Sequence, residues 1–170
     1  MNCVRSWMVA NISILGLLLL YAGPGRAQDA HHGSRKSVCE APHPESICSS
    51  NNTCGSAGSP CAVDVKRTAD SAASIASISE AKANAPFCVK TGTKVTWHSL
   101  SKNTGFVIDF GSSSPFDHPD AIIGGSDRSV TVVAKNPGCF KYSTGACVSG
   151  AVYGMCDSVE ADLVVVGGSD

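Results

Sequence analysis

Short segments of strand-forming residues, separated by Gly, Pro, Ser and Asn, fill the chain from residue 62 to residue 168. In the segment 106–110, the aromatic and aliphatic residues Phe106, Ile108 and Phe110 fall at every second position. Comparable segments are 62–67, 87–90, 94–98, 128–134, 139–143 and 161–166. A two-residue period places alternate side chains on one face of a β-strand. The pattern therefore predicts an all-β sandwich over residues 62–168.

Two longer stretches between these segments are harder to interpret. In 69–85, Ile75 and Ile78 have helical spacing, but the serines compete with a helix backbone for hydrogen bonds, so we expect a loop with a short strand. The stretch 111–127 is expected to be a long connection that plugs one end of the core with Ile122 and Ile123.

The first 27 residues have the features of a signal peptide. A positive charge at Arg5 precedes an apolar run over residues 8–21, and Ala27 follows small residues that suit a cleavage site. The alternative is a membrane anchor, but the unbroken apolar run is shorter than the ~20 residues that span a bilayer. We therefore expect an exported protein, periplasmic or extracellular, with no membrane span in the mature chain.

Cysteine is abundant, and most of it lies outside the predicted signal peptide. The chain has nine cysteines, and cleavage after Ala27 would remove Cys3 and leave an even number. The disulfide candidates are Cys39, Cys48, Cys54, Cys61, Cys88, Cys139, Cys147 and Cys156. An even count in an exported chain predicts disulfides, although the sequence does not choose the pairing.

Four of these cysteines lie in a polar N-terminal segment, residues 28–61, which is too poor in large apolar residues to fold alone. We expect this segment to form a small cap or an arm that disulfides tie to the sandwich. A zinc site is the competing interpretation, but the cysteine spacings lack the C-x₂-C pairs that zinc sites use.

Composition and motif searches exclude several function classes. The net charge is −1, 16% of the residues are charged, and no run of Lys or Arg points to nucleic acid. No nucleotide-binding, metalloprotease or nucleophile-elbow motif is found, so no catalytic residue is predicted and we expect no enzyme activity. Glu160 and Asp162 alternate along a strand and are expected to face solvent. The expected partner is an unidentified protein or small ligand.

Three stretches together resemble the cupredoxins, the blue-copper proteins related to plastocyanin and azurin. They are the strand pair 87–97, the strand 102–110 and the strand and loop 138–155. The resemblance implies a Greek-key β-sandwich that is cupredoxin-like and, in this chain, stabilised by disulfides. It also implies a copper site of two imidazoles, one thiolate and one weak thioether ligand.

Carried over by position, the resemblance implies a copper site that has lost its histidines. The thiolate falls on Cys147 and the thioether on Met155, whereas the histidine positions fall on Gly150 and at about Phe106. Cys147 is then expected in a loop, in a disulfide with Cys139, Cys88 or Cys156. The resemblance thus favours a non-enzymatic binding or structural module without a cofactor.

The alternative function is copper binding or electron transfer at a non-standard site. Such a site would use Cys147, Met155 and a recruited histidine, His118, or the histidine arm at His31 and His32.

A second fold interpretation keeps the sandwich but changes the family. Cys88, Trp97 and Cys139 follow the Cys–Trp–Cys order of immunoglobulin domains, in which a buried Trp packs on a disulfide between the sheets. The tyrosine expected two residues before the second Cys is replaced by Pro137.

Overall fold

We describe the fold from a computed structural model, which covers residues 36–56, 58–69, 71–125, 127–148, 151–153 and 160–168. The predicted signal peptide (1–27), the histidines His31 and His32, and both Met155 and Cys156 lie outside these residues. In the part of the chain that is covered, no helix is long and apolar enough to cross a membrane.

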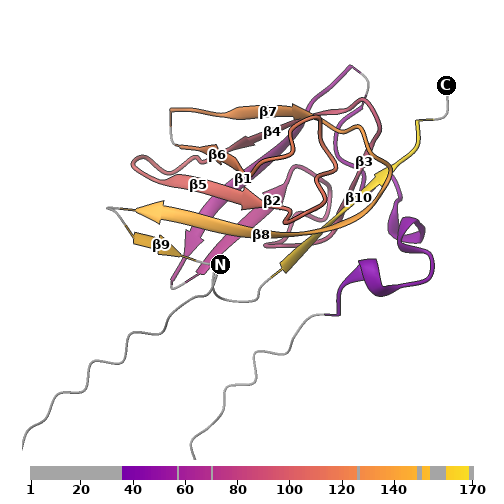
Figure 1. Cartoon of the computed structure of the whole chain (residues 1–170), viewed down its shortest axis with the longest axis horizontal. Helices are drawn as coiled ribbons and strands as arrows, with labels where there is room; N and C mark the ends of the chain where they lie inside the picture. Colours follow the sequence, from indigo (N-terminus) through magenta and orange to yellow (C-terminus); the bar gives the residue numbers. More distant parts are fainter. Residues whose placement is uncertain are drawn as a thin grey trace, which may run out of the picture. The chain divides into compact units, whose positions relative to one another are not determined.

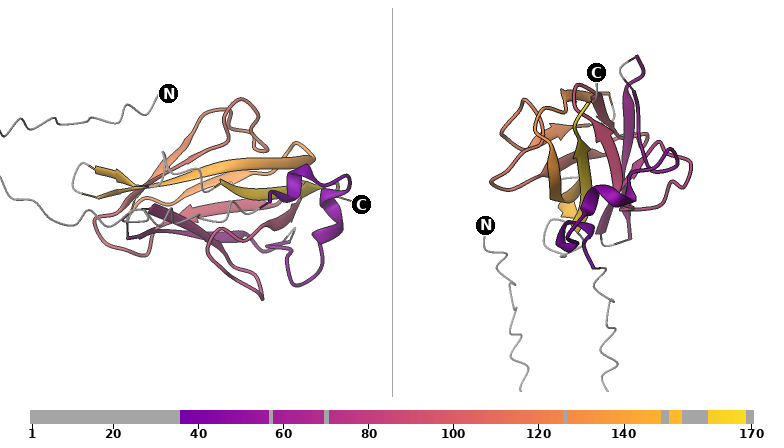
Figure 2. Two further views of the ribbon diagram at one scale, coloured as in Figure 1. Left: turned by 90° about the horizontal axis from the view of Figure 1, so that it is seen from below. Right: turned by 90° about the vertical axis from the view of Figure 1, so that its right-hand side faces the viewer.

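The covered residues form two β-sheets that lie as two layers of a sandwich (Figure 1; Figure 2). One sheet has the order β2 (Ser71–Ala76), β1 (Cys61–Thr68), β4 (Lys94–His98) and β7 (Val130–Val133). The other has the order β3 (Phe87–Lys90), β10 (Glu160–Val166), β8 (Gly138–Val148), β5 (Gly105–Asp109) and β6 (Ile122–Gly124), with β9 (Ala151–Tyr153) paired to β8. The predicted all-β sandwich is therefore confirmed.

The sheets are mixed rather than purely antiparallel. β1 runs parallel to β4, and β10 runs parallel to β3, whereas the other pairs are antiparallel. Parallel neighbours cannot be joined by a tight turn, so the chain between them crosses to the other sheet. Strand β6 ends the second sheet, and β7 ends the first sheet on the same side of the sandwich.

The ambiguous stretches are now assigned. The short strand expected within 69–85 is β2, where Ala72 and Ala73 are buried. The connection 111–127 contains β6. Both Ile122 and Ile123 were expected to close one end of the core, but only Ile122 is buried, whereas Ile123 is 62% exposed. Ile123 points away from the core because consecutive residues of a strand face opposite sides.

The core is centred on Trp97 of β4, which is fully buried between the sheets. Its ring meets Tyr142 of β8 edge-on at 5.5 Å between centroids and Phe116 at 6.5 Å. The hydroxyl of Tyr142 shares a 2.7 Å hydrogen bond with the hydroxyl of Ser74 on β2, so a polar contact joins the two sheets inside the core.

Three disulfides join cysteines in the residues that the structure covers. They are Cys39–Cys139, Cys48–Cys88 and Cys54–Cys61. The first two tie the N-terminal segment to the sandwich, as expected for an arm. The zinc interpretation is wrong, because all four cysteines of that segment are in disulfides. The immunoglobulin interpretation required a bridge between Cys88 and Cys139, and each of these pairs elsewhere.

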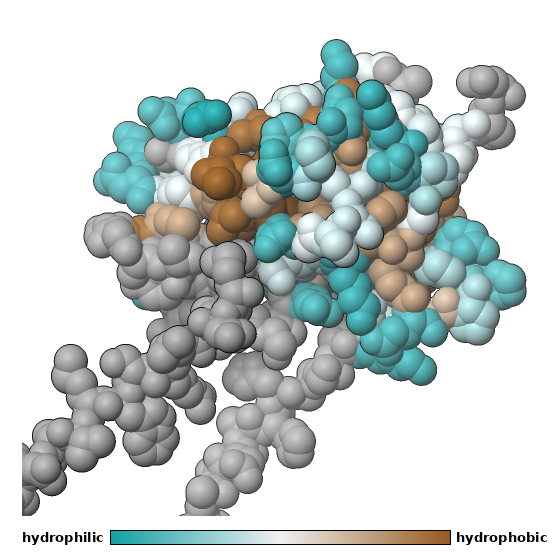
Figure 3. Space-filling view, viewed as in Figure 1, coloured by the Kyte–Doolittle hydropathy of each residue, from teal (hydrophilic) through white to brown (hydrophobic). Residues whose placement is uncertain are grey.

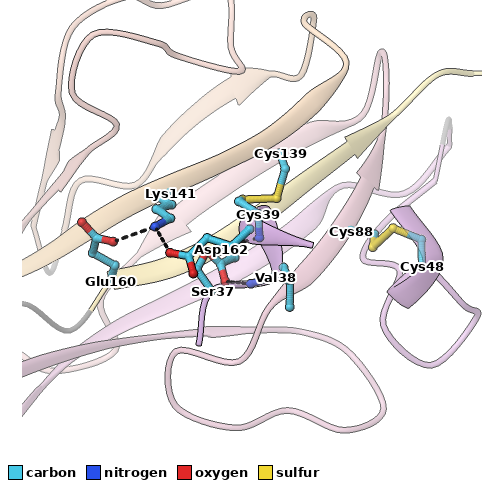
Figure 4. Close-up of a disulfide and its surroundings, with 10 residues drawn as sticks. Ser37, Val38, Cys39, Cys48, Cys88, Cys139, Lys141, Glu160 and Asp162 are labelled. Atoms are coloured by element: carbon cyan, nitrogen blue, oxygen red, sulfur yellow. Dashed lines mark hydrogen bonds and ion pairs between the residues drawn. A yellow bond between two sulfur atoms is a disulfide. The ribbon is translucent and has the colours of Figure 1, made fainter. Parts of the chain in front are cut away.

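The arm, residues 36–48, lies on the outer face of the second sheet (Figure 4). Its short 3₁₀-helix η1 (Val38–Glu40) contacts β8 and β10, and η2 (Pro44–Ile47) contacts β10. Neither helix contains a buried residue, so the arm adds nothing to the apolar core. Disulfides and polar contacts hold it instead.

Asp162 corrects the expectation of a solvent-facing side chain. It is only 7% exposed, because the arm covers it. Its carboxylate accepts a 2.7 Å hydrogen bond from the Ser37 hydroxyl and a 2.8 Å bond from the Val38 N–H (Figure 4).

Glu160, on the same face, meets the expectation. It is exposed and lies 3.7 Å from the Lys141 ammonium, which also binds Glu40 of the arm at 2.9 Å. The hydrogen bond from Lys141 lowers the pKa of Glu40.

Candidate functional site

Cys147 lies in a strand, which overturns the expected metal-binding loop. Strand β8 continues to Val148, and Cys147 is in register with Gly105 of β5 on one side and with Val152 of β9 on the other. Strand β9 runs antiparallel to the end of β8, with Val148 in register with Ala151. The backbone around Cys147 is therefore paired with a neighbouring strand on each side.

The thiol of Cys147 lies on the outer face of the sheet. Its neighbour Ala146 is fully buried, as is Phe106 opposite it, so alternation directs Cys147 away from the core. A Cβ atom at Gly105 would approach the Cys147 Cβ to 3.5 Å, which places both on one face. Cys147 is partly exposed and its thiol is free. The expected disulfide to Cys139 or Cys88 is absent, since both are already paired with the arm.

Phe106 fills the position at which the resemblance places the first copper histidine. Its side chain is 1% exposed and points into the core. The ring packs so closely on Gly124 of β6 that a Cβ atom there would lie 2.3 Å from the Phe106 Cζ atom. An aromatic hydrocarbon that is packed in this way offers no ligand atom.

His118 lies far from Cys147 along the sheet. It is exposed, and its Nδ1 atom lies 3.3 Å from the Asp120 carbonyl oxygen. The residues that follow enter β6, where Ile122 is in register with Ile108, whereas Cys147 is in register with Gly105. Gly105 and Ile108 are three residues apart, about 10 Å along the strand at ~3.3 Å per residue, so Cys147 lies at one end of β5 whereas the chain from His118 enters β6 near the other.

The described residues do not fit a type-1 copper site. Such a site needs two imidazoles and a thiolate in one plane. No group of three His, Cys, Asp or Glu side chains in the covered ranges is placed to hold a metal ion. Met155, the predicted axial ligand, lies outside the described residues. Among these residues Cys147 is thus a single soft donor without a partner ligand.

An open polar hollow that was not predicted from the sequence lies beside the arm. It has a volume of about 820 Å³ and forms where residues 48–56, at the end of the arm and just after it, meet the turn between β3 and β4. Its lining is Cys48, Ser49, Ser50, Thr53, Gly55, Ser56, Lys90, Thr91, Gly92, Thr93 and Gly168. Six of these eleven residues carry a hydroxyl group, and Lys90 is the one charged residue among them. No periodic pattern marks it, because a tertiary contact between distant segments creates it.

Comparison with protein families found no matching family model, and comparison with curated proteins found no match. Solved structures of amicyanin variants are similar. A reduced Cu(I) form at pH 4 has 14% identity and a TM-score of 0.38, over 63% of this chain and 82% of that chain. An oxidised variant has 12% identity and a TM-score of 0.37, over 68% of this chain and 93% of that chain.

These matches have low identity and low TM-scores, and no property of amicyanin is assigned to this chain because of them.

Proposed function

We propose that this protein is an exported, non-enzymatic binding module of an oxidising compartment. Disulfides persist outside the reducing cytoplasm, and three of them join described residues. The compartment is periplasmic or extracellular, in agreement with the predicted signal peptide. The observation that supports loss of the copper role is Phe106, which occupies the first histidine position as a buried core residue.

We place the binding surface in the polar hollow beside the arm. Ligands bind in concave sites where a few placed polar groups fix their orientation. The Cys48–Cys88 disulfide fixes the arm along one wall, while the turn at Gly92 forms another. Hydroxyls and one ammonium favour a hydroxylated ligand, neutral or anionic, over an apolar one.

A panel of neutral and acidic oligosaccharides tests this proposal by chemical-shift mapping on the full chain. We expect shifts at Thr91 and its neighbours, and loss of these shifts in Ser50→Arg, which fills the hollow. Ser112→Arg is the matched control, because Ser112 is an exposed serine outside the hollow. Shifts that are absent, or that survive Ser50→Arg, would refute this binding surface.

Copper binding by Cys147 stays the second candidate, because its free and partly exposed thiol is available to a soft metal ion. The test is the intact mass of the unreduced protein after exposure to Cu(II) and removal of free metal. The main proposal expects no retained copper. One retained copper that is lost in both Cys147→Ser and His118→Ala would establish the alternative, with His118 as the recruited ligand.

A further inference from the structure

The charge of the polar hollow is unbalanced. Among the described residues that line it, Lys90 is charged and none is an Asp or a Glu. The Lys90 side chain is exposed, and its ammonium group has no hydrogen bond or ion pair with any residue that the structure describes. A positive charge on the wall of a concave surface concentrates its field there and attracts anions. The hollow therefore favours a ligand with a negatively charged group.

A tight turn places Thr93 beside Lys90. The Thr93 N–H donates a 3.0 Å hydrogen bond to the Lys90 carbonyl oxygen, and Gly92 between them has a φ of 87°, which glycine adopts without strain. A turn of this kind brings its first and fourth residues to within ~7 Å, Cα to Cα. The two residues are therefore close neighbours, and both line the hollow.

The hydroxyl of Thr93 has no partner inside the described protein. Thr93 is only 2% exposed, and its methyl group packs against Gly55, where an added Cβ atom would lie 2.9 Å from it. The hydroxyl forms no hydrogen bond with any described residue, yet it is not among the unpartnered polar atoms that the described residues enclose completely. Buried polar groups normally have a partner. This hydroxyl is thus available to a ligand in the hollow.

The hollow is separate from the apolar surface of the molecule. Figure 3 shows apolar surface gathered over β5 and β6, and neither strand contributes a residue to the lining of the hollow. A ligand in the hollow therefore meets hydroxyl groups and one ammonium group rather than an apolar patch.

We propose that the hollow binds an acidic oligosaccharide, and that Lys90 and Thr93 hold one of its carboxylates. An ammonium group only donates hydrogen bonds and an ionised carboxylate only accepts them, so the two are complementary. Charge-assisted hydrogen bonds of this kind are about twice as strong as neutral ones. This inference rests on the binding surface proposed above, and it adds the charge of the ligand and the two residues that select it.

The test is calorimetric titration of the full, disulfide-bonded chain with a galacturonate trimer and with the methyl ester of the same trimer. The two probes share sugar and linkage and differ in charge. We expect the dissociation constant of the acid to be at least tenfold below that of the ester, and we expect Lys90→Gln to remove this difference. Lys94→Gln is the matched control, because Lys94 is an exposed lysine outside the hollow.

Thr93→Val tests the second contact. It should weaken binding of the acid at least threefold without lowering the denaturation midpoint, because the hydroxyl has no partner among the described residues. Thr91→Val is its control, since the Thr91 hydroxyl already donates a 3.1 Å hydrogen bond to the Val166 carbonyl oxygen.

The outcomes separate this inference from the proposed binding surface. Equal affinity for acid and ester would overturn the inference and leave the binding surface standing, whereas binding of neither probe would overturn both. A preference for the acid that survives Lys90→Gln would show that Lys90 does not select the ligand, and the inference would then be wrong.

Discussion

Gly124 packs against Phe106, the residue at the position where the resemblance places the first copper histidine. The Phe106 ring occupies the space beside it, and the Arg128 carbonyl oxygen would lie 2.7 Å from an added Cβ atom. Backbone and a buried ring cannot both move aside, so no residue other than glycine fits here while Phe106 is present.

We therefore predict that Gly124→Ala lowers the free energy of unfolding by about 1–3 kcal/mol, the usual range for overpacking. Chemical denaturation of the oxidised protein provides the measurement. Gly167→Ala is the control, because a Cβ atom at Gly167 meets nothing within 4 Å. Equal effects of the two substitutions would show that the close contact with Phe106 is not what constrains Gly124.

Tyr142 gives the core a predictable response to alkaline pH. Burial raises the pKa of Tyr142 well above its usual value, more than the hydrogen bond with Ser74 lowers it. The unfolded chain releases this proton near pH 10, while the folded chain keeps it. The neutral phenol thus stabilises the fold fully below about pH 10, and that contribution declines as the pH rises toward the folded-state pKa.

Unfolding free energy measured between pH 8 and pH 11.5 should fall above about pH 10, by up to ~1.4 kcal/mol per pH unit for this one proton. Tyr142→Phe should flatten that part of the profile, while lowering stability by about 1 kcal/mol at neutral pH through the lost hydrogen bond. A profile with the same slope in the variant would assign the alkaline response to other groups.

Besides its two disulfides, the arm is held by hydrogen bonds to one buried side chain, Asp162. Asp162 is the acceptor for two donors of the arm, one a hydroxyl and one a backbone N–H. Hydrogen bonds to a buried carboxylate are stronger than those between neutral groups.

Asp162→Asn replaces one acceptor oxygen with a donor, so we expect a loss of about 1–2 kcal/mol in the free energy of unfolding and faster amide exchange at Val38. Glu160→Gln, on the same face but exposed, should change stability by less than ~0.5 kcal/mol. If amide exchange at Val38 is the same in both variants, Asp162 does not anchor the arm.

At the scale of elements, the local sequence pattern predicted the strands correctly but did not predict which segments cover their outer faces. Alternation around Phe106 and Ile108 predicted β5, because the two-residue period is a property of the strand itself. Alternation also placed Asp162 on the outer face, but Ser37 of the arm that buries it comes 125 residues earlier in the chain. No local signal reports such a contact.

The loop expected around Cys147 was wrong for a related reason. The spacing from Cys147 to Met155 matched a metal-binding loop, whereas the backbone around Cys147 pairs with β5 and β9. Strand pairing depends on the partner strands more than on intrinsic preference. The number of cysteines predicted disulfides, but the sequence did not say which cysteines pair. Cys39 and Cys139 are separated by 100 residues, and pairing across that distance follows from the fold.

At the scale of the whole molecule, the disulfides bear directly on the compartment. The short helices of the arm bury no residue, so reduction of Cys39–Cys139 and Cys48–Cys88 leaves the arm with polar contacts alone. A bridge typically adds ~2–4 kcal/mol, and a domain of this size has only ~5–15 kcal/mol of net stability. Three bridges are therefore comparable with the entire stability of the fold.

We predict that the reduced protein is largely unfolded, or that its denaturation midpoint falls by more than half, in the same buffer in which the oxidised protein is stable. Near-UV circular dichroism reports the buried Trp97 and Tyr142 environment, and intact mass confirms that the bridges are open. Cys147→Ser, kept oxidised, is the control, because it removes the free thiol without opening a bridge. A fully reduced protein with an unchanged midpoint would mean that the sandwich is stable without its bridges, and the disulfides would then no longer tie the fold to an oxidising compartment.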